Sequence, residues 1–424
     1  MAFRKSALAL ILLGVMLFIL SPWTEAPSRT SLPSPIMQKD DVETLEPVMA
    51  RVPSLLTVEA ALSDAEFGIL EEQNKLYMTR HRNVMVNLIQ IRPEDAYEHF
   101  KTSLEMGDAA DVMLVRNEWV KPFAVAGHLL PADAAFVGSA QAEQFAAVAA
   151  PAKWNGYFWG VPKDIDPYVT LWNSALLRTL LGENIAFPLS AEQWQQLAAK
   201  SEAMPSPVSW LSLNPEDPMA LLSWLDNASG ERTDTLIDSV YDQWRGGALD
   251  SAFGILDQHR AGVTMDADAM QAGRSVIEGR TAAAVIPFSA AVRLSYETPR
   301  GSTIQVDRSS WNLPFVWPRG RSFVISAQTE SEEAAYTWMA EMTDGPAQLE
   351  YYKQWGLLPV YRSVFEQDLQ LSDLIPSRIP MRFPNEPPGS SEPELYSRLT
   401  HLGELWRAFA EGRLSLEDWQ KQCS

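Results

Sequence analysis

The sequence predicts an α/β protein of two lobes, and two observations lead to that prediction. The chain has 424 residues, more than the roughly 250–300 residues over which a single hydrophobic core keeps growing. From residue 55 onward, short apolar and β-branched runs alternate with segments of helical periodicity, the order expected of a mostly parallel sheet covered by helices. Hydrophobic residues make up 46% of the chain, which is enough material for two cores.

The N-terminus carries an apolar segment of the kind that directs a chain to or through a membrane. Arg4 and Lys5 precede an uncharged run over residues 7–20. Roughly 7–15 apolar residues suit the core of a signal peptide, whereas about 20 are needed to span a bilayer. The small-residue cleavage pattern is missing, so we expect residues 1–26 to be either a signal peptide or an uncleaved membrane anchor. In both cases the folded body lies outside the cytoplasm.

The single cysteine, Cys423, lies near the C-terminus. An intrachain disulfide is therefore impossible, and the body must be held together by core packing. A bacterial lipoprotein needs a cysteine directly after its apolar run, so we do not expect lipid attachment there. The protein is expected to be secreted or periplasmic, or tethered to the outer face of the cytoplasmic membrane by an uncleaved N-terminal segment.

Charge and motif content argue against several functional classes. The net charge is −20 and no cluster of Lys and Arg is visible, whereas nucleic-acid partners are bound by clustered positive charge. The five histidines are scattered, and no H-E-x-x-H, G-x-S-x-G or phosphate-cradling glycine loop occurs. We therefore expect no nucleic-acid partner, no catalytic residue, no metal ligand and no cofactor.

The alternating elements begin after a linker rich in proline and serine, residues 27–53. Ligands of parallel sheets bind beyond the carboxyl ends of the strands, which predicts a site near residues 61–64 and 116–119. The elements predicted in this part are strands over 55–60, 84–91 and 111–115, and helices over 65–77, 95–105 and 118–129.

The rest of the chain continues the same alternation. Residues 188–278 are mainly helical by pattern, and a second proline-rich stretch, 376–393, precedes a last helical segment that contains Tyr396 and Trp406. The elements predicted between them are strands over 280–287 and 322–326, and helices over 330–342 and 347–354.

The most distinctive segment is GYFWGVPKDIDPYVTLWN, residues 156–173. Its two runs rich in β-branched and aromatic residues, 157–161 and 168–172, are interrupted by Pro162 and Pro167, which predicts a strand, a polar joint over 163–166 and a second strand. The segment is either an ordinary surface hairpin or a binding surface where two pieces of structure meet.

Several motifs occur in a fixed order along the chain. They are AGHLLPAD (126–133), GYFWGVP and LWNSALL within 156–177, SAEQWQQLA (190–198), VIEGRTAAAVIPF (276–288), EEAAYTWMAEMTDGPAQLEYYKQWGLLPV (332–360) and AEGRLSLEDW (410–419). With this series the chain resembles the extracellular solute-binding proteins of ABC importers, in particular carbohydrate-binding family 1, which includes maltose-binding protein. The resemblance covers residues 55–420.

This resemblance implies a two-lobe periplasmic-binding-protein fold of type II, with a ligand cleft between lobes that are joined by several hinge crossings. The first crossing would follow Val161 and enter the second lobe at 169–173, and the others would lie near 286–289 and 326–329. The implied lobes are 54–165 with 289–327, and 166–288 with 328–424. The implied function is that of a non-catalytic monomer that captures a sugar or oligosaccharide and delivers it to ABC permease subunits.

Candidate binding residues follow from the chemistry of sugars, which need aromatic platforms and directional hydrogen-bonding groups. For each of them a role in the core or in a solvated loop is the alternative. The candidates are Lys163, Asp164 and Asp166 at the first crossing; Asp64, Asn117 and Glu118 after strand ends; Asn214 in a loop; and Trp119, Trp210, Phe288, Trp311 and Trp355, which the resemblance places at the cleft.

Two alternatives to transport remain open at the level of sequence. The turn at Gly320 and the end of the first strand depart from the pattern of the family, which leaves the ligand undetermined. Because the lipid-attachment cysteine is missing, an anchored solute sensor that feeds a signalling partner is one alternative. A secreted glycoside hydrolase that uses Asp164 and Asp166 is the other, because such enzymes work with paired carboxyl groups.

Overall fold

The computed structural model of the chain describes residues 53–231, 233, 246–298, 303–312, 317, 319–374, 383–386 and 392–422. The predicted signal peptide or anchor, the linker up to residue 52 and most of the second proline-rich stretch lie outside the described residues. Every element below belongs to one compact unit, Arg51–Ser424. No helix in the described part of the chain has the length and apolar character needed to cross a membrane.

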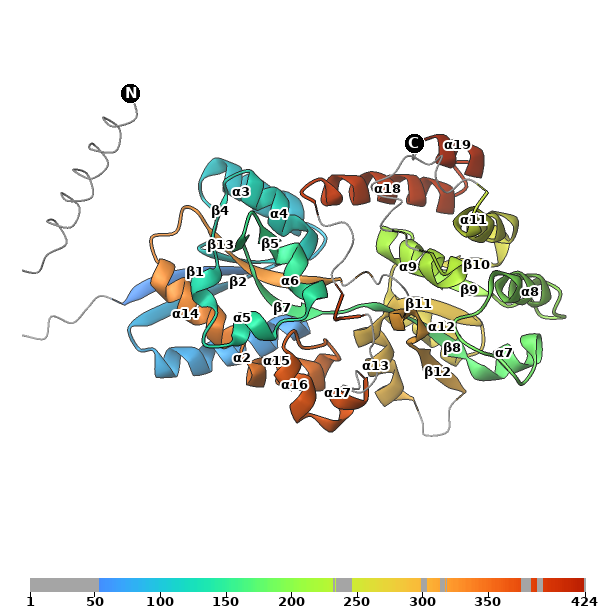
Figure 1. The fold of residues 1–424 in the computed structure, drawn as a ribbon, viewed down its shortest axis with the longest axis horizontal. Helices are drawn as coiled ribbons and strands as arrows, with labels where there is room; N and C mark the ends of the chain where they lie inside the picture. Colours follow the sequence, from blue (N-terminus) through green and yellow to red (C-terminus); the bar gives the residue numbers. More distant parts are fainter. Residues whose placement is uncertain are drawn as a thin grey trace, which may run out of the picture. The chain divides into compact units, whose positions relative to one another are not determined.

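The first sheet has the strand order β2-β1-β3-β13-β4, with β7 paired to β13 at one edge (Figure 1). β1 is parallel to β2 and β3, whereas β13 is antiparallel to β3, β4 and β7. The sheet is therefore mostly parallel at its N-terminal strands, as predicted. Its strands are β1 (Ser54–Ala61), β2 (Val84–Ile91), β3 (Val112–Arg116), β4 (Leu129–Leu130), β7 (Val161–Ile165) and β13 (Gly320–Ser326).

Helices cover both faces of this sheet, and β3 shows why. Val112 and Leu114 belong to one core, whereas Met113 and Val115 belong to another on the opposite face. Alternate side chains of a strand point to opposite faces, so a strand that is apolar throughout needs a cover on each side. The first core is covered by α2 (Asp64–Arg80) and α14 (Glu332–Met342), and the second by α3 (Ala96–Met106) and α4 (Asn117–Val125).

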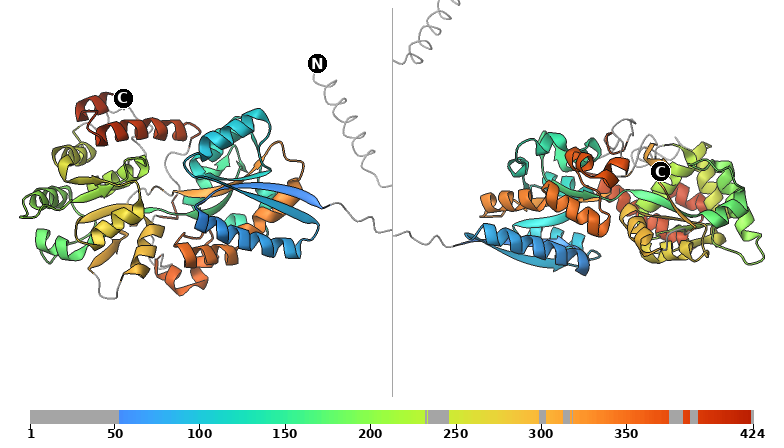
Figure 2. Two further views of the ribbon diagram at one scale, coloured as in Figure 1. Left: turned by 180° about the vertical axis from the view of Figure 1, so that it is seen from behind. Right: turned by 90° about the horizontal axis from the view of Figure 1, so that it is seen from below.

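The second sheet has the order β10-β9-β11-β8-β12 and lies beside the first in the views of Figure 2. Its strands are β8 (Tyr168–Asn173), β9 (Leu211–Leu213), β10 (Val263–Met265), β11 (Ala283–Pro287) and β12 (Ile304–Asp307). One core is shared with α7 (Ser174–Leu181), α8 (Ala191–Glu202), α9 (Pro218–Ser229), α11 (Ala248–Gln258), α18 (Leu395–Ala410) and α19 (Leu416–Gln422), and the other with α12 (Ala269–Ile277) and α13 (Phe288–Glu297).

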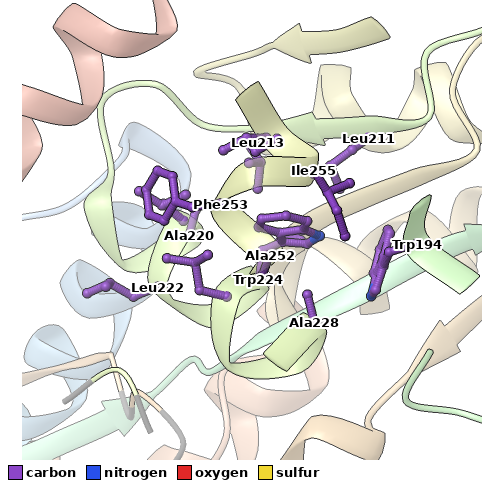
Figure 3. Packing of buried hydrophobic residues seen from close by; sticks show 14 of the residues in the cluster. Trp194, Leu211, Leu213, Ala220, Leu222, Trp224, Ala228, Ala252, Phe253 and Ile255 are labelled. Carbon is purple, nitrogen blue, oxygen red and sulfur yellow. The ribbon is translucent and has the colours of Figure 1, made fainter. Parts of the chain in front are cut away.

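A cluster of tryptophans belongs to one core of the second lobe, and two of them, Trp194 and Trp224, are labelled among its buried residues in Figure 3. Trp194 is fully buried, and the centres of its rings lie 5.1 Å from those of Trp172, 6.0 Å from Trp210 and 5.8 Å from Trp224. Tilted and edge-to-face contacts at these distances are the favourable arrangements of aromatic rings. Part of the generous supply of tryptophan in this sequence is therefore used for packing.

The first crossing between the sheets follows β7 directly, because β8 begins after Asp166 and Pro167. The predicted bounds of the strand over 157–161 are wrong. The strand β7 runs over Val161–Ile165, and Tyr157–Phe158 form a separate short strand, β6, which pairs with β5 (Lys153–Trp154). Pro162 is tolerated inside β7 because, among the described residues, the strand pairs there with β13 alone, and the bridge to Leu358 on its other side is made by Ile165. Lys163 and Asp164 therefore lie in a strand and not in a polar joint.

The second crossing lies later than predicted. After β11, α13 and β12 remain with the second sheet, where β12 pairs with β8, and the chain returns to the first sheet only at β13. The assignment of residues 289–307 to the first lobe is therefore wrong. The hydrophobic side chains of α13 explain this, because Phe288 and Leu294 belong to the core beneath the second sheet.

The third crossing is also later than predicted near residues 326–329. Ala335, Trp338 and Met339 of α14 pack on the first sheet, so the assignment of residues 332–342 to the second lobe is wrong. The chain rejoins the second lobe at α18. Between them, α15 (Gly345–Trp355), α16 (Arg362–Gln367) and α17 (Leu369–Leu374) lie at the junction, where Leu358 pairs with Ile165 of β7.

The short elements complete the described part of the chain. They are η1 (Asp133–Ala135), α5 (Ala140–Glu143), α6 (Ala146–Ala152), η3 (Arg260–Gly262) and η4 (Ser309–Asn312).

The tryptophan cluster predicts a large loss of stability on truncation. Trp224→Ala should lower the free energy of unfolding by about 3–5 kcal/mol, because it leaves a cavity among buried rings. Tyr296→Ala is the matched control, since this side chain is 69% exposed and its loss should cost no more than about 0.5 kcal/mol. Urea denaturation followed by circular dichroism measures both, and equal losses would contradict the packing described.

Candidate functional site

A cleft of about 400 Å³ lies at the junction of the two sheets, within the range of roughly 300–1,000 Å³ that small-molecule sites occupy. Ala61 and Arg116 place it at the carboxyl ends of β1 and β3, as predicted for a parallel sheet. The second lobe contributes Pro287 at the end of β11. The lining residues are Ala61, Ser63, Glu66, Pro93, Leu114, Val115, Arg116, Trp119, Asp164, Asp166, Ala269, Pro287, Ser289, Ala290, Arg293, Arg319, Gly320, Arg321, Trp355 and Leu357.

Arg321 on β13 binds two carboxylates of the first lobe. Its Nη2 lies 2.6 Å from Oδ2 of Asp164, and its Nη1 lies 3.0 Å from Oε1 of Glu66. Burial raises the pKa of Asp164, but the charges of Arg321 and Lys163 outweigh burial and hold this pKa below its usual value. The same balance between burial and Arg321 lowers the pKa of Glu66. Both carboxyl groups therefore face the cleft as ionised hydrogen-bond acceptors.

Asp166, at the first crossing, is held by two distant segments. Its Oδ1 accepts a hydrogen bond from the backbone N–H of Ser289 at 2.9 Å, and its Oδ2 accepts one from Ser289 Oγ at 2.7 Å. Arg319 donates to the same Oδ2 at 3.3 Å, and the carbonyl oxygen of Arg319 accepts the Asp166 N–H at 2.7 Å. Burial raises the pKa of Asp166 more than these partners lower it.

Lys163 is buried beneath the cleft, with only 1% of its side chain exposed. Its Nζ lies 3.3 Å from Asp164 Oδ2 and 3.1 Å from the centre of the Tyr351 ring. Burial lowers the pKa of Lys163 to about 8, against the opposing effect of Asp164. Lys163 does not line the cleft, and its ammonium group stabilises the ionised form of Asp164, which does.

An aromatic cluster that includes Trp119, a residue of the cleft lining, joins α18 to the first lobe. Trp119 belongs to α4, and Tyr396 of α18 meets Trp119 and Tyr97 with ring centres 6.1 and 4.1 Å apart. Tyr97 belongs to α3 of the first lobe, whereas α18 packs with the second lobe and reaches toward α4 in Figure 1. The aromatic cluster therefore connects the two lobes.

The predicted site residues fall into three groups. Trp119, Asp164, Asp166 and Trp355 line the cleft. Three others are buried against lining or neighbouring residues and do not line it themselves. They are Asn117, which accepts a hydrogen bond from Ser322, Glu118, which binds Arg116, and Lys163, which binds Asp164.

The remaining predictions lie elsewhere. Asp64 is exposed at the start of α2 and bonded to Gln90, and Asn214 lines an adjoining cavity of about 80 Å³. The placement of three aromatic residues at the cleft is wrong: Trp210, Phe288 and Trp311 are at most 3% exposed and belong to the hydrophobic cores. Their large apolar surfaces gain more from packing than a cleft position would provide.

The sequence analysis missed the arginines that organise the cleft. Arg319 and Arg321 meet carboxylates that lie 153 and 157 residues away in the sequence. The available signal was the departure from the family pattern around Gly320, which places one arginine on each side of a glycine. Ser289 and Arg293 carried no such signal, because nothing local shows which face of α13 meets the cleft.

Two α/β lobes with a charged and aromatic cleft at their junction define a two-lobed binding protein. A sequence profile described as bacterial extracellular solute-binding protein matches residues 74–373, more than half of the chain. The protein belongs to this family, and its function is solute binding outside the cytoplasm. A search of curated proteins found no match.

Several solved structures are similar in fold. The GacH receptor of Streptomyces glaucescens aligns with a TM-score of 0.69 at 18% identity, covering 88% of this chain and 96% of that chain. The sugar-binding protein MalE of Xanthomonas citri aligns with a TM-score of 0.66 at 16% identity, covering 87% and 95%. A solute-binding protein of Thermotoga lettingae aligns with a TM-score of 0.64 at 15% identity, covering 88% and 100%. These likenesses confirm the predicted two-lobe fold.

Within the described residues, no group of three or more His, Cys, Asp or Glu side chains could hold a metal ion.

The buried Lys163 predicts a stability difference that depends on pH. Its folded pKa of about 8 lies below the ordinary value of 10.5, so between these values the unfolded chain binds more protons than the folded chain. The stability of the wild type relative to Lys163→Met should therefore rise with pH across this window, by at most about 1.4 kcal/mol per pH unit.

Below pH 8 the same difference should be flat, because both states are then protonated. The measurement is urea denaturation of both proteins at several pH values. The exposed Lys153 provides the control, since Lys153→Met should give a constant difference. A constant difference for Lys163→Met as well would contradict the burial of this ammonium group.

The aromatic connection predicts an effect on the distance between the lobes. Tyr396→Ala removes the ring contacts between α18 and the first lobe, and contacts of this kind contribute about 0.5–1.5 kcal/mol each. The ligand-free variant should therefore populate more open arrangements and show a larger radius of gyration in X-ray scattering. Tyr296→Ala serves again as the exposed control, and an unchanged scattering curve for Tyr396→Ala would speak against a link between the lobes.

Proposed function

We propose that this protein captures a small carbohydrate, a sugar or an oligosaccharide, and delivers it to the permease subunits of an ABC importer. The observation that carries the proposal is the composition of the cleft. Two indole rings, those of Trp119 and Trp355, line the same cavity as the carboxylates of Asp164 and Asp166. Sugars combine apolar ring faces with hydroxyl groups, so this combination of platforms and acceptors suits them.

The similar structures support this ligand class. The GacH receptor was solved in complex with acarbose, the Thermotoga lettingae protein was solved with α-D-tagatose, and the Xanthomonas citri protein is described as sugar-binding. We extend the carbohydrate class, and not a particular sugar, to this chain.

The contacts of the two aspartates support binding rather than hydrolysis. A glycoside hydrolase needs one carboxyl group that is free to donate a proton to the leaving oxygen. Asp164 is held ionised by Arg321, and both oxygens of Asp166 already accept hydrogen bonds from Ser289 and Arg319. Asp164 is therefore not arranged as a general acid, whereas the pKa of Asp166 is raised by burial and its two oxygens are engaged by Ser289 and Arg319.

We also propose that the N-terminal part of the chain tethers the protein to the outer face of the membrane. The apolar run over residues 7–20 and the linker over 27–53 support a tether that keeps the binding body outside the cytoplasm, where a permease collects its ligand. We propose that the body works as a monomer, because a single chain supplies both walls of the cleft.

A ligand screen tests the proposal. A bound sugar should raise the melting temperature of the protein, because a ligand at a hundredfold excess over its Kd stabilises the fold by about 2.7 kcal/mol. Trp119→Ala and Trp355→Ala should each weaken binding about 10-fold or more, through loss of a platform. Trp154→Ala, outside the lining of the cleft, is the matched control.

Isothermal titration measures these affinities, and chromatography of the incubated saccharides checks for turnover. If no saccharide changed the melting temperature, carbohydrate binding would be wrong. Release of shorter saccharides that stops in an Asp164→Asn variant would establish a hydrolase instead.

A further inference from the structure

The lining of the cleft has an excess of positive charge, although the whole chain has a net charge of −20. Four arginines line it, whereas Glu66, Asp164 and Asp166 are its carboxylates. Three of the arginines bind acidic partners at 2.5–3.3 Å, namely Arg116 with Glu118, Arg319 with Asp166, and Arg321 with Asp164. Glu118 and Asp217, which lie behind the lining beside Arg116 and Arg319, balance these charges further, so the arginine to explain is the remaining one, Arg293.

Arg293 differs from the other three, because it has no hydrogen bond and no ion pair among the described residues. Its guanidinium carbon lies 5.0 Å from the centre of the Trp355 ring, within the range of a cation–π contact. Its Nε is buried and has no acceptor, and the Nε1 of Trp355 is likewise buried without an acceptor. Two adjacent lining residues therefore keep hydrogen-bond donors that no protein group uses.

The packing of two helices holds this pair together. Arg293 belongs to α13, and Trp355 is the last residue of α15, which ends at Gly356 with a φ of 74°. A Cβ atom on Gly356 would lie 2.9 Å from Cβ of Val292 and 3.1 Å from Cα of Ser289. Only glycine combines this backbone conformation with so close an approach, so the ends of the two helices are fitted to each other.

The guanidinium of Arg293 and the indole N–H of Trp355 are hydrogen-bond donors, and they favour a ligand with a negatively charged acceptor group. A carboxylate only accepts hydrogen bonds and matches the planar guanidinium in a bidentate manner, whereas a hydroxyl group both donates and accepts. Arg293 is half-buried, and a neutral sugar bound against it would displace water from the guanidinium without supplying a counter-charge, which is unfavourable.

We propose that the ligand of this cleft is an acidic carbohydrate, a saccharide that bears a carboxylate such as a uronic-acid unit. Arg293, with Trp355, binds the carboxylate, while the ion-paired groups Asp164 and Asp166 accept hydrogen bonds from hydroxyl groups of the ring. This inference rests on the proposed function, since it narrows the class of sugar that the same site accepts.

Isothermal titration of the full chain with matched pairs of sugars tests the inference. The pairs are galacturonate with galactose and glucuronate with glucose, supplemented by digalacturonate, maltose, galactose 6-phosphate and tartrate. The acidic member of a pair should bind about 10- to 100-fold more tightly than the neutral member, the range that a hydrogen bond to a charged group provides. Its affinity should fall as salt is added.

Two variants assign the preference to a residue. Arg293→Gln should bring the affinities for the two members of a pair to within about threefold of each other, with an unchanged melting temperature in the absence of ligand. Arg362→Gln is the matched control, because Arg362 also stacks on an aromatic ring, that of Phe145 at 5.5 Å, and does not line the cleft. It should keep the full preference.

The outcomes separate this inference from the proposed function. Equal or tighter binding of neutral sugars, or an unchanged preference in Arg293→Gln, would overturn the acidic ligand and leave carbohydrate binding intact. Tightest binding of the sugar phosphate would overturn the carboxylate. Binding of tartrate alone, or of none of these compounds, would overturn both the inference and the proposed carbohydrate function.

Discussion

The hydrogen bonds of Asp166 join three segments that lie far apart in the sequence. Its carboxylate accepts from Ser289 at the start of α13 and from Arg319 just before β13, and its own N–H donates to the Arg319 carbonyl oxygen. A carboxylate near a helix N-terminus is favoured by the helix dipole. Because the first two crossings meet at this residue, Asp166 sets where the end of β11 and the start of β13 lie, and with them two walls of the cleft.

Other charged side chains of the cleft are likewise held by partners of opposite charge. Burying a charge is unfavourable unless it is paired, and Arg321 with Asp164 and Glu66 meets that condition inside the first lobe. Lys163 adds a second positive charge behind Asp164. The network keeps acceptors ionised at the surface of the cleft without needing a ligand. Arg293 has a ring beside it but no acidic ion-pair partner among the described residues, so it lies outside this network, and the proposed preference for an acidic ligand rests on that difference.

More of the fold than of the binding site could be predicted from the sequence. The alternation of strands and helices located β1, β2 and β3, and the rule of carboxyl strand ends placed the cleft near Ala61 and Arg116. The later crossings were placed too early, because α13 and α14 are amphipathic segments whose sequences do not state which sheet they cover. The same reason misplaced Trp210, Phe288 and Trp311: an aromatic residue after a strand suits a core as well as a cleft.

By itself the sequence determined the α/β class, the two-lobe organisation and the apolar N-terminal segment, whereas it left residues 156–173 open between a surface hairpin and a binding surface. These depend on local periodicity and composition, which can be read without coordinates. The tertiary structure decided which charges meet, because Arg319 and Arg321 reach carboxylates more than 150 residues away. It also decided that Arg293 meets Trp355 and, within the part of the chain that the structure describes, no acidic side chain. Such pairings depend on how distant elements pack, and no local pattern records that.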